Sequence, residues 1–378
     1  MKATPRKEPA DTAPALHVLA LNSGSSSCKF GLYRVTDSGA ETLLAETAAR
    51  DPRHAVRDLK KRLAKSGLPA PEAIGHRVVH GGSALRQHCL LDEAVLQQLH
   101  AAAACAPLHL PAALSLMQQA QKDFPALPQV ACFDTTFHAE LPEVARVLPI
   151  AKEWQAEGIQ RYGFHGLACE SIVAQFGQDV PPRLIIAHLG NGASITAVKN
   201  GQSIDTSMGL TPAGGILMGT RSGDLDPGVL IYLLRAKKFD VGMLEELINH
   251  QSGLLGVSGV DSDMRRLREA AVSNPDARLA IQMFCYSVCK QVAGMIAVLG
   301  GVDCLVFTGG IGEHDEKIRA AICGSLAWLG ISLDEARNRA ARNPLSDAVS
   351  RCAVQVFPAQ EGLKIARHTW ALVTGRLR

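Results

Sequence analysis

The sequence has little of what would mark a protein that binds nucleic acid or a membrane. Its formal net charge is only +3 over 378 residues, and charged residues make up 20% of the chain. Because Lys and Arg are scattered among Asp and Glu, no basic surface for nucleic acid or for an anionic membrane is expected. The expected partners are small molecules, with neither nucleic acid nor a membrane among them.

Cysteine occurs without the spacing of a metal site or of a disulfide framework. Ten cysteines are spread from Cys28 to Cys352, and none forms a CxxC pair. Cys285 and Cys289 lie at helical spacing in an apolar stretch, where free thiols behave as small hydrophobic side chains. Because the chain opens without the apolar core of a signal peptide, the pattern predicts reduced thiols and a cytoplasmic protein.

No apolar run is long enough to predict a transmembrane helix. Lys290, Gln291 and Asp303 interrupt the longest apolar region before the roughly 20 residues that a bilayer requires. The hydrophobic content of 47% instead predicts a large buried core, and the length exceeds that of one typical domain. We therefore expect two domains, preceded by a disordered tail at residues 1–14, which are rich in Pro, Ala and charge.

Short apolar runs alternate with longer helical patterns from Leu16 onwards. Strands are expected at residues 17–22, 74–79, 129–134, 183–190, 193–201 and 304–310. Helices are expected at residues 51–67, 92–106, 224–238, 275–300 and 333–342. This alternation predicts an α/β fold.

Two segments of the chain resemble each other weakly. Residues 19–35 and 186–202 each run from an apolar strand, through a turn rich in Gly, Ser or Asn, into a second strand. A duplicated domain would explain this similarity, and so would two unrelated hairpins in an α/β protein. The residues alone leave both interpretations open.

The first of these turns has the composition of a phosphate-binding loop. Residues 22–29 combine serine hydroxyls, a glycine and the charge of Lys29, all of which suit phosphate oxygens. The amide oxygen of Asn22 could bind Mg²⁺ or its waters. A flexible serine-rich turn has the same composition, and the Walker pattern GxxxxGK[ST] is absent.

Two further glycine-rich turns also follow expected strands. In residues 188–194, the glycines would let backbone amides approach a ligand, and Asn191 could donate to a phosphate oxygen. In residues 307–314, the glycines would admit a nucleotide or a ribose. Since each turn alone is a weak signal, we interpret the three together as parts of one site for a polyphosphate ligand.

Three charged residues stand in unusual surroundings. Arg77 and Arg221 lie in apolar, glycine-rich runs, and guanidinium groups suit the oxygens of carboxylates and phosphates. Asp134, at the end of an expected strand, could orient a nucleophile or approach a metal. For each of the three, one half of a buried ion pair is the alternative interpretation.

Two histidines and one glutamate complete the candidates. His165 and His188 are the histidines that we expect near charge, although neutral histidines in a protein core are commoner than catalytic ones. Glu361 precedes an expected helix and could ligate a metal. It could also be only a helix-start glutamate that the helix dipole stabilises.

In their order along the chain, these runs resemble a known enzyme family. The runs LNSGSSSCK, GHRVVHGG, APLH, FDTTFH, RYGFHG, HLGNGAS, DTSMGLTPAGGILMGTRSGDLDP, SGVDSDMR and FTGGIGE look like those of acetate kinases and of the related propionate and butyrate kinases. The resemblance extends from about Leu16 to the C-terminus. The long run at residues 205–227 is its most specific part.

The resemblance implies a fold of the acetate and sugar kinase, Hsp70 and actin superfamily. That fold is α/β, with two domains of duplicated ββαβαβα topology (actin-like ATPase, ribonuclease H-like) and an interdomain active-site cleft. By position, residues 15–147 with 362–378 would form the N-terminal domain, and residues 148–361 would form the C-terminal, nucleotide-binding domain. A homodimer is also implied.

The resemblance assigns roles to residues that match the family's motifs. The implied catalytic residues are Asp134, Arg77, Arg221 and His165, and the residues associated with Mg²⁺ (or Mn²⁺) are Asn22 and Glu361. The short-chain carboxylate would be bound by Arg77, Val79, Leu108 and Pro212. ATP or ADP would be bound by Ser25, Ser27, Lys29, His188, Asn191, Gly192, Asp263, Met264, Arg265, Gly310, Ile311, Gly312, Glu313 and His314.

The implied reaction is the reversible transfer of a phosphoryl group from ATP to acetate, by direct in-line attack, to give acetyl phosphate and ADP. A propionate or butyrate kinase is an alternative, and so is a non-catalytic nucleotide-binding module with an actin-like fold. Leu110, His314 and Gly362 depart from the family's common pattern. Because Leu110 stands where a polar Asn is usual, we expect surroundings of the acyl pocket that are no more polar than in the family.

Overall fold

The computed structural model describes residues 15–23, 28–48, 65–105 and 110–376. The predicted tail at 1–14 lies outside the described residues, as does nearly all of the predicted helix at 51–67.

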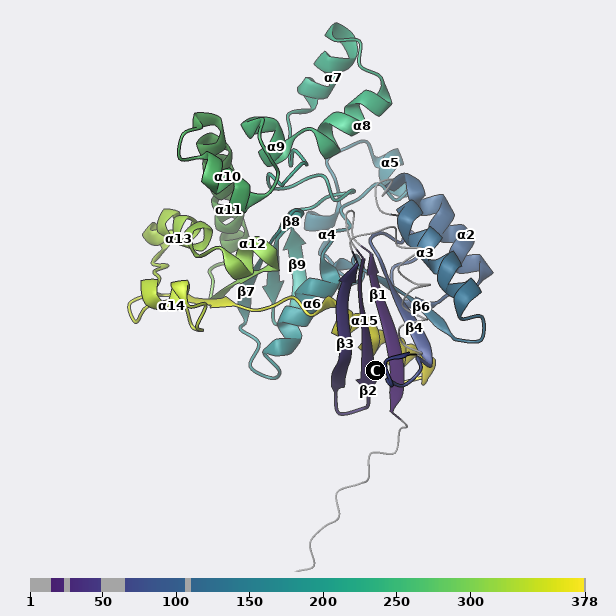
Figure 1. The fold of residues 1–378 in the computed structure, drawn as a ribbon. Coiled ribbons are helices and arrows are strands. Elements are labelled where there is room, and N and C mark those ends of the chain that lie inside the picture. The colour runs from purple at the N-terminus through teal and green to yellow at the C-terminus, as the bar shows by residue number, and fades with distance from the viewer. Residues whose placement is uncertain (1–14, 24–27, 49–64, 106–109, 377–378) are drawn as a thin grey trace, which may run out of the picture. The chain divides into compact units, whose positions relative to one another are not determined.

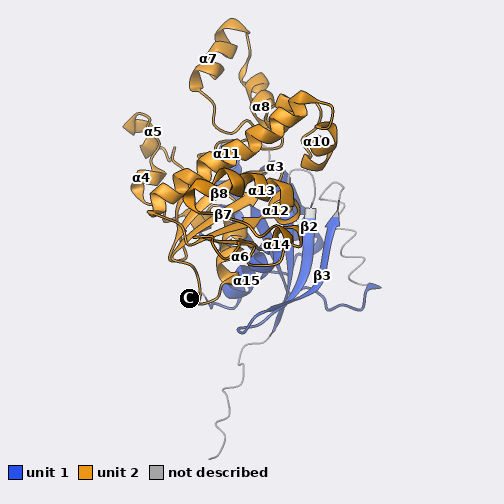
Figure 2. Ribbon diagram, turned by 90° about the vertical axis from the view of Figure 1, so that its left-hand side faces the viewer, with its two compact units in different colours: residues 1–134, 360–378 blue, residues 135–359 orange. Residues whose placement is uncertain are grey.

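The chain divides into two compact units, which are described here one at a time (Figure 2). Unit 1 comprises residues 1–134 and 360–378, and unit 2 comprises residues 135–359. These limits differ from the predicted domain limits near 147 and 362, and the domain assignment itself stays a prediction.

Unit 1 is built on a mixed sheet whose strands follow the order β3-β2-β1-β4-β6-β5. Its strands are β1 (Leu16–Ser23), β2 (Cys28–Val35), β3 (Ala40–Ala48), β4 (Ala73–Val78), β5 (Cys89–Leu90) and β6 (Gln129–Phe133). The first three strands pair antiparallel, whereas β1, β4 and β6 are parallel neighbours. Strand β1 is almost wholly buried, as expected for a central strand that is covered on both faces.

Unit 2 repeats this arrangement in a sheet of order β11-β10-β7-β8-β9. Its strands are β7 (Arg183–Leu189), β8 (Ala193–Lys199), β9 (Gln202–Thr206), β10 (Cys304–Thr308) and β11 (Ala353–Val356). Again the first three strands along the chain, β7, β8 and β9, pair antiparallel. Strands β7, β10 and β11 are parallel neighbours. The hairpins β1–β2 and β7–β8 thus occupy equivalent places, which confirms duplication as the reason for their similarity.

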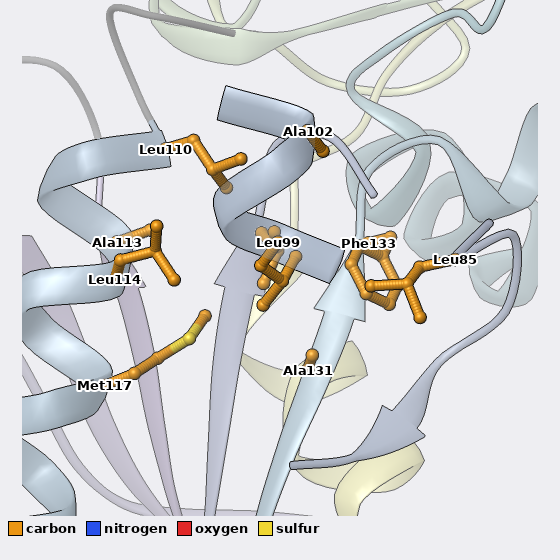
Figure 3. Packing of buried hydrophobic residues seen from close by; sticks show 10 residues of the cluster. Leu85, Leu99, Ala102, Leu110, Ala113, Leu114, Met117, Ala131 and Phe133 are labelled. Atoms are coloured by element: carbon orange, nitrogen blue, oxygen red, sulfur yellow. The ribbon is translucent and has the colours of Figure 1, made fainter. Parts of the chain in front are cut away.

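Among the described residues of unit 1 are the helices α2 (Glu93–Ala101), α3 (Leu110–Asp123) and α15 (Glu361–Val373), with a 3₁₀ turn η1 (Ala102–Cys105). Helix α15 packs on β1 and β4. Gly75 of β4 permits this approach, because a Cβ atom there would collide with Thr369 and Ile365 of the helix. On α2, α3 and the neighbouring strands, a cluster that includes Leu99, Leu110, Met117 and Phe133 forms part of the core (Figure 3).

The helices of unit 2 surround its sheet (Figure 1). They are η2 (Thr136–His138), α4 (Glu143–Arg146), α5 (Lys152–Ala156), α6 (Gly166–Gln175), α7 (Pro227–Ala236), α8 (Val241–His250), α9 (Gly253–Ser258), α10 (Met264–Ala270), α11 (Pro275–Leu299), α12 (Gly309–His314), α13 (Glu316–Ser325), η3 (Ala327–Leu329) and α14 (Glu335–Arg339). Several of these helices begin after an Asp or Asn whose side chain accepts hydrogen bonds from backbone N–H groups of the first turn. Asp226 and Asn274 are examples, and a proline follows each of them.

Helix α11 is the long apolar helix of unit 2. By length and composition alone it could cross a membrane, contrary to the expectation from the sequence. In the structure it packs against β7 and β8 of the sheet and against α9, α10 and α13. Cys285 and Cys289 are buried in it as free thiols, which agrees with their interpretation as core side chains.

Candidate active site

Three polar side chains of unit 1 lie at the carboxyl ends of neighbouring parallel strands. Asn22 is the penultimate residue of β1, Arg77 is the penultimate residue of β4, and Asp134 directly follows β6. Because β1, β4 and β6 are parallel neighbours, their carboxyl ends meet at one edge of the sheet. The topology therefore brings together three residues that the sequence had suggested separately.

Arg77 and Asp134 form a buried ion pair. The guanidinium group donates to Asp134 Oδ2 through Nε at 2.9 Å and through Nη2 at 2.6 Å. Burial alone would lower the pKa of Arg77, but the charges of Asp134 and Glu361 outweigh this effect and raise that pKa above its usual value. Arg77 is thus permanently charged, and Asp134 fixes its orientation. The buried ion pair that was the alternative interpretation of Arg77 and Asp134 is therefore present.

Asn22 connects this ion pair to Glu361. Its Oδ1 accepts a hydrogen bond from Arg77 Nη1 at 3.2 Å, and its Nδ2 donates to Glu361 Oε2 at 2.6 Å. Glu361 is the first residue of α15, where the helix dipole favours a carboxylate. Asp134, Arg77, Asn22 and Glu361 therefore form one chain of hydrogen bonds, which we call the unit 1 polar chain.

The oxygen atoms of the unit 1 polar chain fit a hard divalent cation. Mg²⁺ is bound in proteins through one or two carboxylates, with amide or water oxygens completing its coordination. Asp134 and Glu361 supply carboxylates, and Asn22 supplies an amide oxygen. These donors are of the kind that Mg²⁺ prefers, and the magnesium site itself stays a prediction.

The other predicted residues of unit 1 are divided between described and undescribed segments. Ser25, Ser27 and Leu108 lie outside the described residues. Lys29 is exposed on β2, where it pairs in register with Asn22 of β1. Val79 is buried immediately after β4.

Leu110 belongs to the core of unit 1. It begins α3, is fully buried, and packs in the core cluster with Leu99 and Leu114 (Figure 3). Burying a leucine here stabilises the fold, because its side chain leaves water for the apolar space between the helices. The expectation about Leu110 and the surroundings of the acyl pocket stays a prediction.

In unit 2, the turn between β7 and β8 brings a glycine close to two of the predicted side chains. A Cβ atom on Gly192 would lie 2.8 Å from Arg221 Nη2 and 3.4 Å from His165 Nε2. Only a residue without a side chain allows the backbone to approach these groups so closely. Gly192, Arg221 and His165 therefore lie together, and we call them the unit 2 cluster.

Arg221 is buried and held by backbone groups. Its Nη1 donates to the carbonyl oxygen of Pro212 at 2.7 Å. Gly253, with φ +64°, lies against the backbone of Arg221, where any side chain would collide. Pro212 thus contacts Arg221 within unit 2, whereas Val79 belongs to unit 1, so the predicted acyl pocket stays a prediction.

His165 has a left-handed backbone, with φ 58° and ψ 25°. This conformation costs a residue other than glycine about 1–3 kcal/mol, so the surrounding structure must hold it. The imidazole Nδ1 lies 2.9 Å from Ser194 Oγ, and the ring stacks on His188 with the two centroids 4.3 Å apart. Ser194 was visible in the sequence only as the end of the second glycine-rich turn.

Asn191 packs against the loop that carries Arg221. Its carbonyl oxygen accepts a hydrogen bond from Gly219 N at 3.0 Å. A Cβ atom on Gly219 would collide with the Asn191 side chain, so the two segments touch directly. The second glycine-rich turn and the run at 205–227 are therefore neighbours in unit 2.

The third glycine-rich run is a short helix, α12, rather than an open loop. Gly310 and His314 are exposed on it, whereas Gly312 is buried. The Glu313 carboxylate accepts hydrogen bonds from the backbone N–H groups of Gly309 at 3.0 Å and Ala359 at 3.2 Å. Glu313 therefore holds backbone, which the sequence did not indicate.

Arg319 supports the same helix from its other end. It is buried, and its Nη1 donates to the carbonyl oxygens of Gly312 and Glu313, each at 2.9 Å. Burial lowers the pKa of this guanidinium group, and the charges of Glu316 and Asp315 oppose that shift. No pattern in the sequence singled out this residue.

Asp263, Met264 and Arg265 form the start of α10. Asp263 caps the helix by accepting a hydrogen bond from Arg265 N, and its carboxylate also binds the Arg265 side chain at 2.7 Å. Hydrogen bonding to Arg265 lowers the pKa of Asp263 to about 2. Met264 is buried.

Sequence comparison identifies one family. The model of the acetokinase family matches residues 35–367 of the chain. The acetate kinase of Rhodopseudomonas palustris is 40% identical over 396 residues, which cover 95% of this chain and 98% of that protein. The acetate kinase of Deinococcus radiodurans is 42% identical over 392 residues, with the same two coverages.

Solved structures of similar sequence have the same fold. A propionate kinase from Francisella tularensis superimposes with a TM-score of 0.86 at 36% identity, covering 94% of this chain and all of that one. An acetate kinase from Porphyromonas gingivalis gives a TM-score of 0.82 at 35% identity, covering 95% of this chain and all of that one. The likeness therefore extends over both units.

Proposed function

The chain belongs to the acetokinase family and is an enzyme that transfers a phosphoryl group between ATP and acetate, and we propose that the side chains described above carry out this transfer. The observation that supports this proposal most is the unit 1 polar chain, in which Asp134 orients Arg77. It presents a cationic group at the carboxyl ends of the parallel strands β1, β4 and β6, the edge of a sheet where α/β proteins commonly bind their ligands.

Arg77 binds the carboxylate of acetate in this proposal. A guanidinium group has five N–H donors, and the hydrogen bonds to Asp134 and Asn22 use three of them. Within the described part of the chain, two N–H donors of Arg77 remain, one on Nη1 and one on Nη2. Such a pair can bind the two oxygens of a carboxylate or a phosphate at the same time. By the family resemblance, Val79, Leu108 and Pro212 are the residues assigned to the methyl group.

The transfer is a direct in-line displacement. An acetate oxygen attacks the γ-phosphorus of ATP, the bond from that phosphorus to the β–γ bridging oxygen breaks, and ADP leaves. Such a reaction asks the protein mainly for positioning and for neutralisation of charge on the moving group. Arg221 and His165 supply this neutralisation. Acetate is ionised at pH 7 and has no proton to lose, so Asp134 acts by orienting Arg77 rather than as a general base.

Asn22 and Glu361, with Asp134 near them, would hold Mg²⁺ or Mn²⁺. The bound cation supplies positive charge that offsets the charge of the phosphate oxygens.

The nucleotide is bound by backbone as much as by side chains. Lys29 with Ser25 and Ser27, and Asn191 with His188 and Gly192, contact the phosphates. The adenosine lies against Gly310, Ile311, Gly312 and His314. Asp263, Met264, Arg265 and Glu313 belong to the same proposed nucleotide site, and the carboxylates of Asp263 and Glu313 are bound to neighbouring groups.

Propionate is a second candidate substrate, because a propionate kinase is among the structures that superimpose well on this chain. One methylene group in an apolar pocket changes discrimination by about 10- to 200-fold, so both acids are expected to react. Val79→Ala, which removes buried side-chain volume, should shift the preference towards propionate and butyrate. An unchanged ratio would remove Val79 from the pocket.

A homodimer formed through unit 2 is the proposed assembly, and the thiols buried as free cysteines support a cytoplasmic location. Helix α7 supports the dimer, because none of its residues is buried. Its apolar side chains Ile231 and Tyr232 are 48% and 54% exposed. A monomeric chain would leave this apolar face in water. Light scattering should give twice the chain mass of 40.2 kDa, and the mass of a single chain at micromolar concentration would refute the dimer.

The proposed function is tested by measuring acyl phosphate as its hydroxamate, with MgATP and acetate, propionate or butyrate. Turnover is expected with acetate, and its loss is expected in Arg77→Ala and Arg221→Ala, because an arginine that acts on a transferring phosphoryl group is worth about 10³-fold or more. Arg342→Ala, which alters an exposed arginine of unit 2, is the control. Near-normal turnover in either site variant would exclude that arginine from the mechanism.

A further inference from the structure

His138 is a buried histidine for which the reaction above has no use. It is the last residue of η2 and is only 2% exposed. Both of its ring nitrogens are engaged: Nε2 lies 3.0 Å from the carbonyl oxygen of Phe164, and Nδ1 lies 2.8 Å from Ser203 Oγ in β9. The ring therefore joins η2, β9 and the segment that precedes α6.

These partners determine the tautomer of His138. A carbonyl oxygen can only accept, so Nε2 carries the hydrogen and donates it to Phe164. Nδ1 then accepts the hydroxyl hydrogen of Ser203. Burial lowers the pKa of His138 to about 4, so the ring is neutral at pH 7. A neutral ring bound at both nitrogens has one preferred orientation.

Two of the residues that His138 contacts, Gly163 and Phe164, directly precede His165. Gly163 has φ +73°, and a Cβ atom there would lie 2.8 Å from Cγ and Cδ2 of the His138 ring. The ring thus packs directly on Gly163 and binds the carbonyl group of Phe164. The next peptide unit leads into the left-handed backbone of His165.

His165 needs such support because its backbone conformation is unfavourable for any residue with a side chain. Ser194 fixes the imidazole through Nδ1, but it does not fix the backbone. His138 restrains the turn at 163–165, together with the backbone hydrogen bonds from Gly163 N to Gly209 O and from Cys169 N to His165 O.

We propose that His138 is a positioning residue for His165, which acts by holding the turn at 163–165 and thereby the place of the His165 imidazole beside Gly192 and Arg221. The proposal rests on the role of His165 in the proposed function. It predicts that His138 affects turnover only while His165 is present.

A double-mutant cycle tests this prediction with His138→Gln, His165→Ala and the double variant, assayed for acyl phosphate formation. His138→Gln should lower kcat, on the order of 10²-fold for a displacement of about 1 Å, with little change in either KM. In the His165→Ala background the same change should cost nothing more, because the two effects pass through one side chain. Ser203→Ala, which leaves the ring in place and removes one tie, should give a smaller loss with the same dependence on His165.

The outcomes separate this inference from the proposed function. If His165→Ala retains full turnover, the role of His165 in the proposed function fails, and His138 has nothing to position. If His165→Ala is slow and the two losses multiply, the proposed function survives and the positioning role of His138 is overturned. Urea unfolding of each variant distinguishes lost fold from lost turnover. Should His138→Gln not fold, the cycle is run with Ser203→Ala.

A measurement without turnover examines the geometry itself. Nitrogen-15 shifts of the histidine rings in the unaltered protein should show the Nε2–H tautomer for His138 at pH 7. An Nδ1–H tautomer would mean that the ring does not donate to Phe164, and it would overturn the proposal.

Discussion

The guanidinium group of Arg77 donates two hydrogen bonds to a single oxygen of Asp134, at 2.6 and 2.9 Å. Side-chain exposure is 13% for Arg77 and 0% for Asp134, so the pair is largely shielded from water. Removing one partner of such a pair costs more than the pair itself contributes, because the other charge stays buried.

Asp134→Ala is therefore expected to destabilise the fold by about 3–5 kcal/mol as well as to abolish turnover. A matched control is Asp303→Ala, since Asp303 pairs with Arg183 at 2.5 Å but the two side chains are 33% and 39% exposed. That change should cost only about 1 kcal/mol. Urea unfolding of both variants measures the difference, and equal losses would contradict the buried pair.

Glu361→Gln is expected to raise the Mg²⁺ concentration that gives half-maximal activity by about 10- to 100-fold, with activity partly restored at high Mg²⁺. The reason is the loss of a carboxylate that bonds to Asn22 in the unit 1 polar chain. Glu335→Gln is the control, because Glu335 is likewise the first residue of a helix, α14. If the two variants have the same Mg²⁺ dependence as the unaltered protein, Glu361 is only a helix-start glutamate.

Gly192→Ala should lower kcat strongly while leaving the fold stable. The added methyl group would lie 2.8 Å from Arg221 Nη2 and 3.4 Å from His165 Nε2, so the unit 2 cluster must move. A displacement of about 1 Å can cost about 10²-fold in rate. Gly294→Ala in α11 is the control, because a Cβ atom at this position meets nothing within 4 Å. Replacing a glycine by alanine inside a helix should raise the free energy of unfolding by about 0.5–1 kcal/mol. Steady-state kinetics with normal turnover for Gly192→Ala would separate Gly192 from the site.

The buried histidines predict a pH dependence of stability. Burial lowers the pKa of His76 and of His138 to about 4, against 6.5 in an exposed histidine. Below pH 6.5 the two histidines are protonated in the unfolded chain but remain neutral in the folded chain. Their contribution to the free energy of unfolding is therefore fully present above pH 6.5 and falls as the pH drops towards 4. Each histidine contributes a slope of about 1.4 kcal/mol per pH unit in that window.

His76→Gln should flatten this slope, because glutamine does not titrate. Urea unfolding at pH 7, 6 and 5 measures the slope in the unaltered protein and in the variant. Identical slopes would show that His76 is protonated equally in the folded and unfolded chains.

The sequence predicted the central strands of both sheets because their apolar runs are short and bounded by turns. The expected strand at 74–79 is β4 at Ala73–Val78, and the expected strand at 129–134 is β6 at Gln129–Phe133. Strand β3, AETLLAETA, was not expected, because its charged residues and alanines weaken the alternation. Helix α12 was not expected either, since its three glycines oppose a helix and the side chains of Glu313 and Arg319 hold its ends.

Motifs identified the candidate residues but not their partners. Arg77 and Asp134 are 57 positions apart, and Asn22 and Glu361 are 339 apart, so only the fold shows that they bond. His138 lay unnoticed in the run FDTTFH because its partners, Phe164 and Ser203, come from other elements. The core position of Leu110 was not visible for a similar reason, since no local pattern tells a core leucine from one beside a ligand.

Unit 1 is discontinuous in the chain, whereas residues 135–359 of unit 2 form one uninterrupted segment. Helix α15 covers β1 and β4, yet it follows the whole of unit 2 in the sequence. During synthesis, the first sheet must therefore wait without this layer while the ribosome makes all of the second. Unit 2 can complete its core first. The nascent sheet of unit 1, with the face that Gly75 turns towards α15 still uncovered, is then the segment most in need of a chaperone.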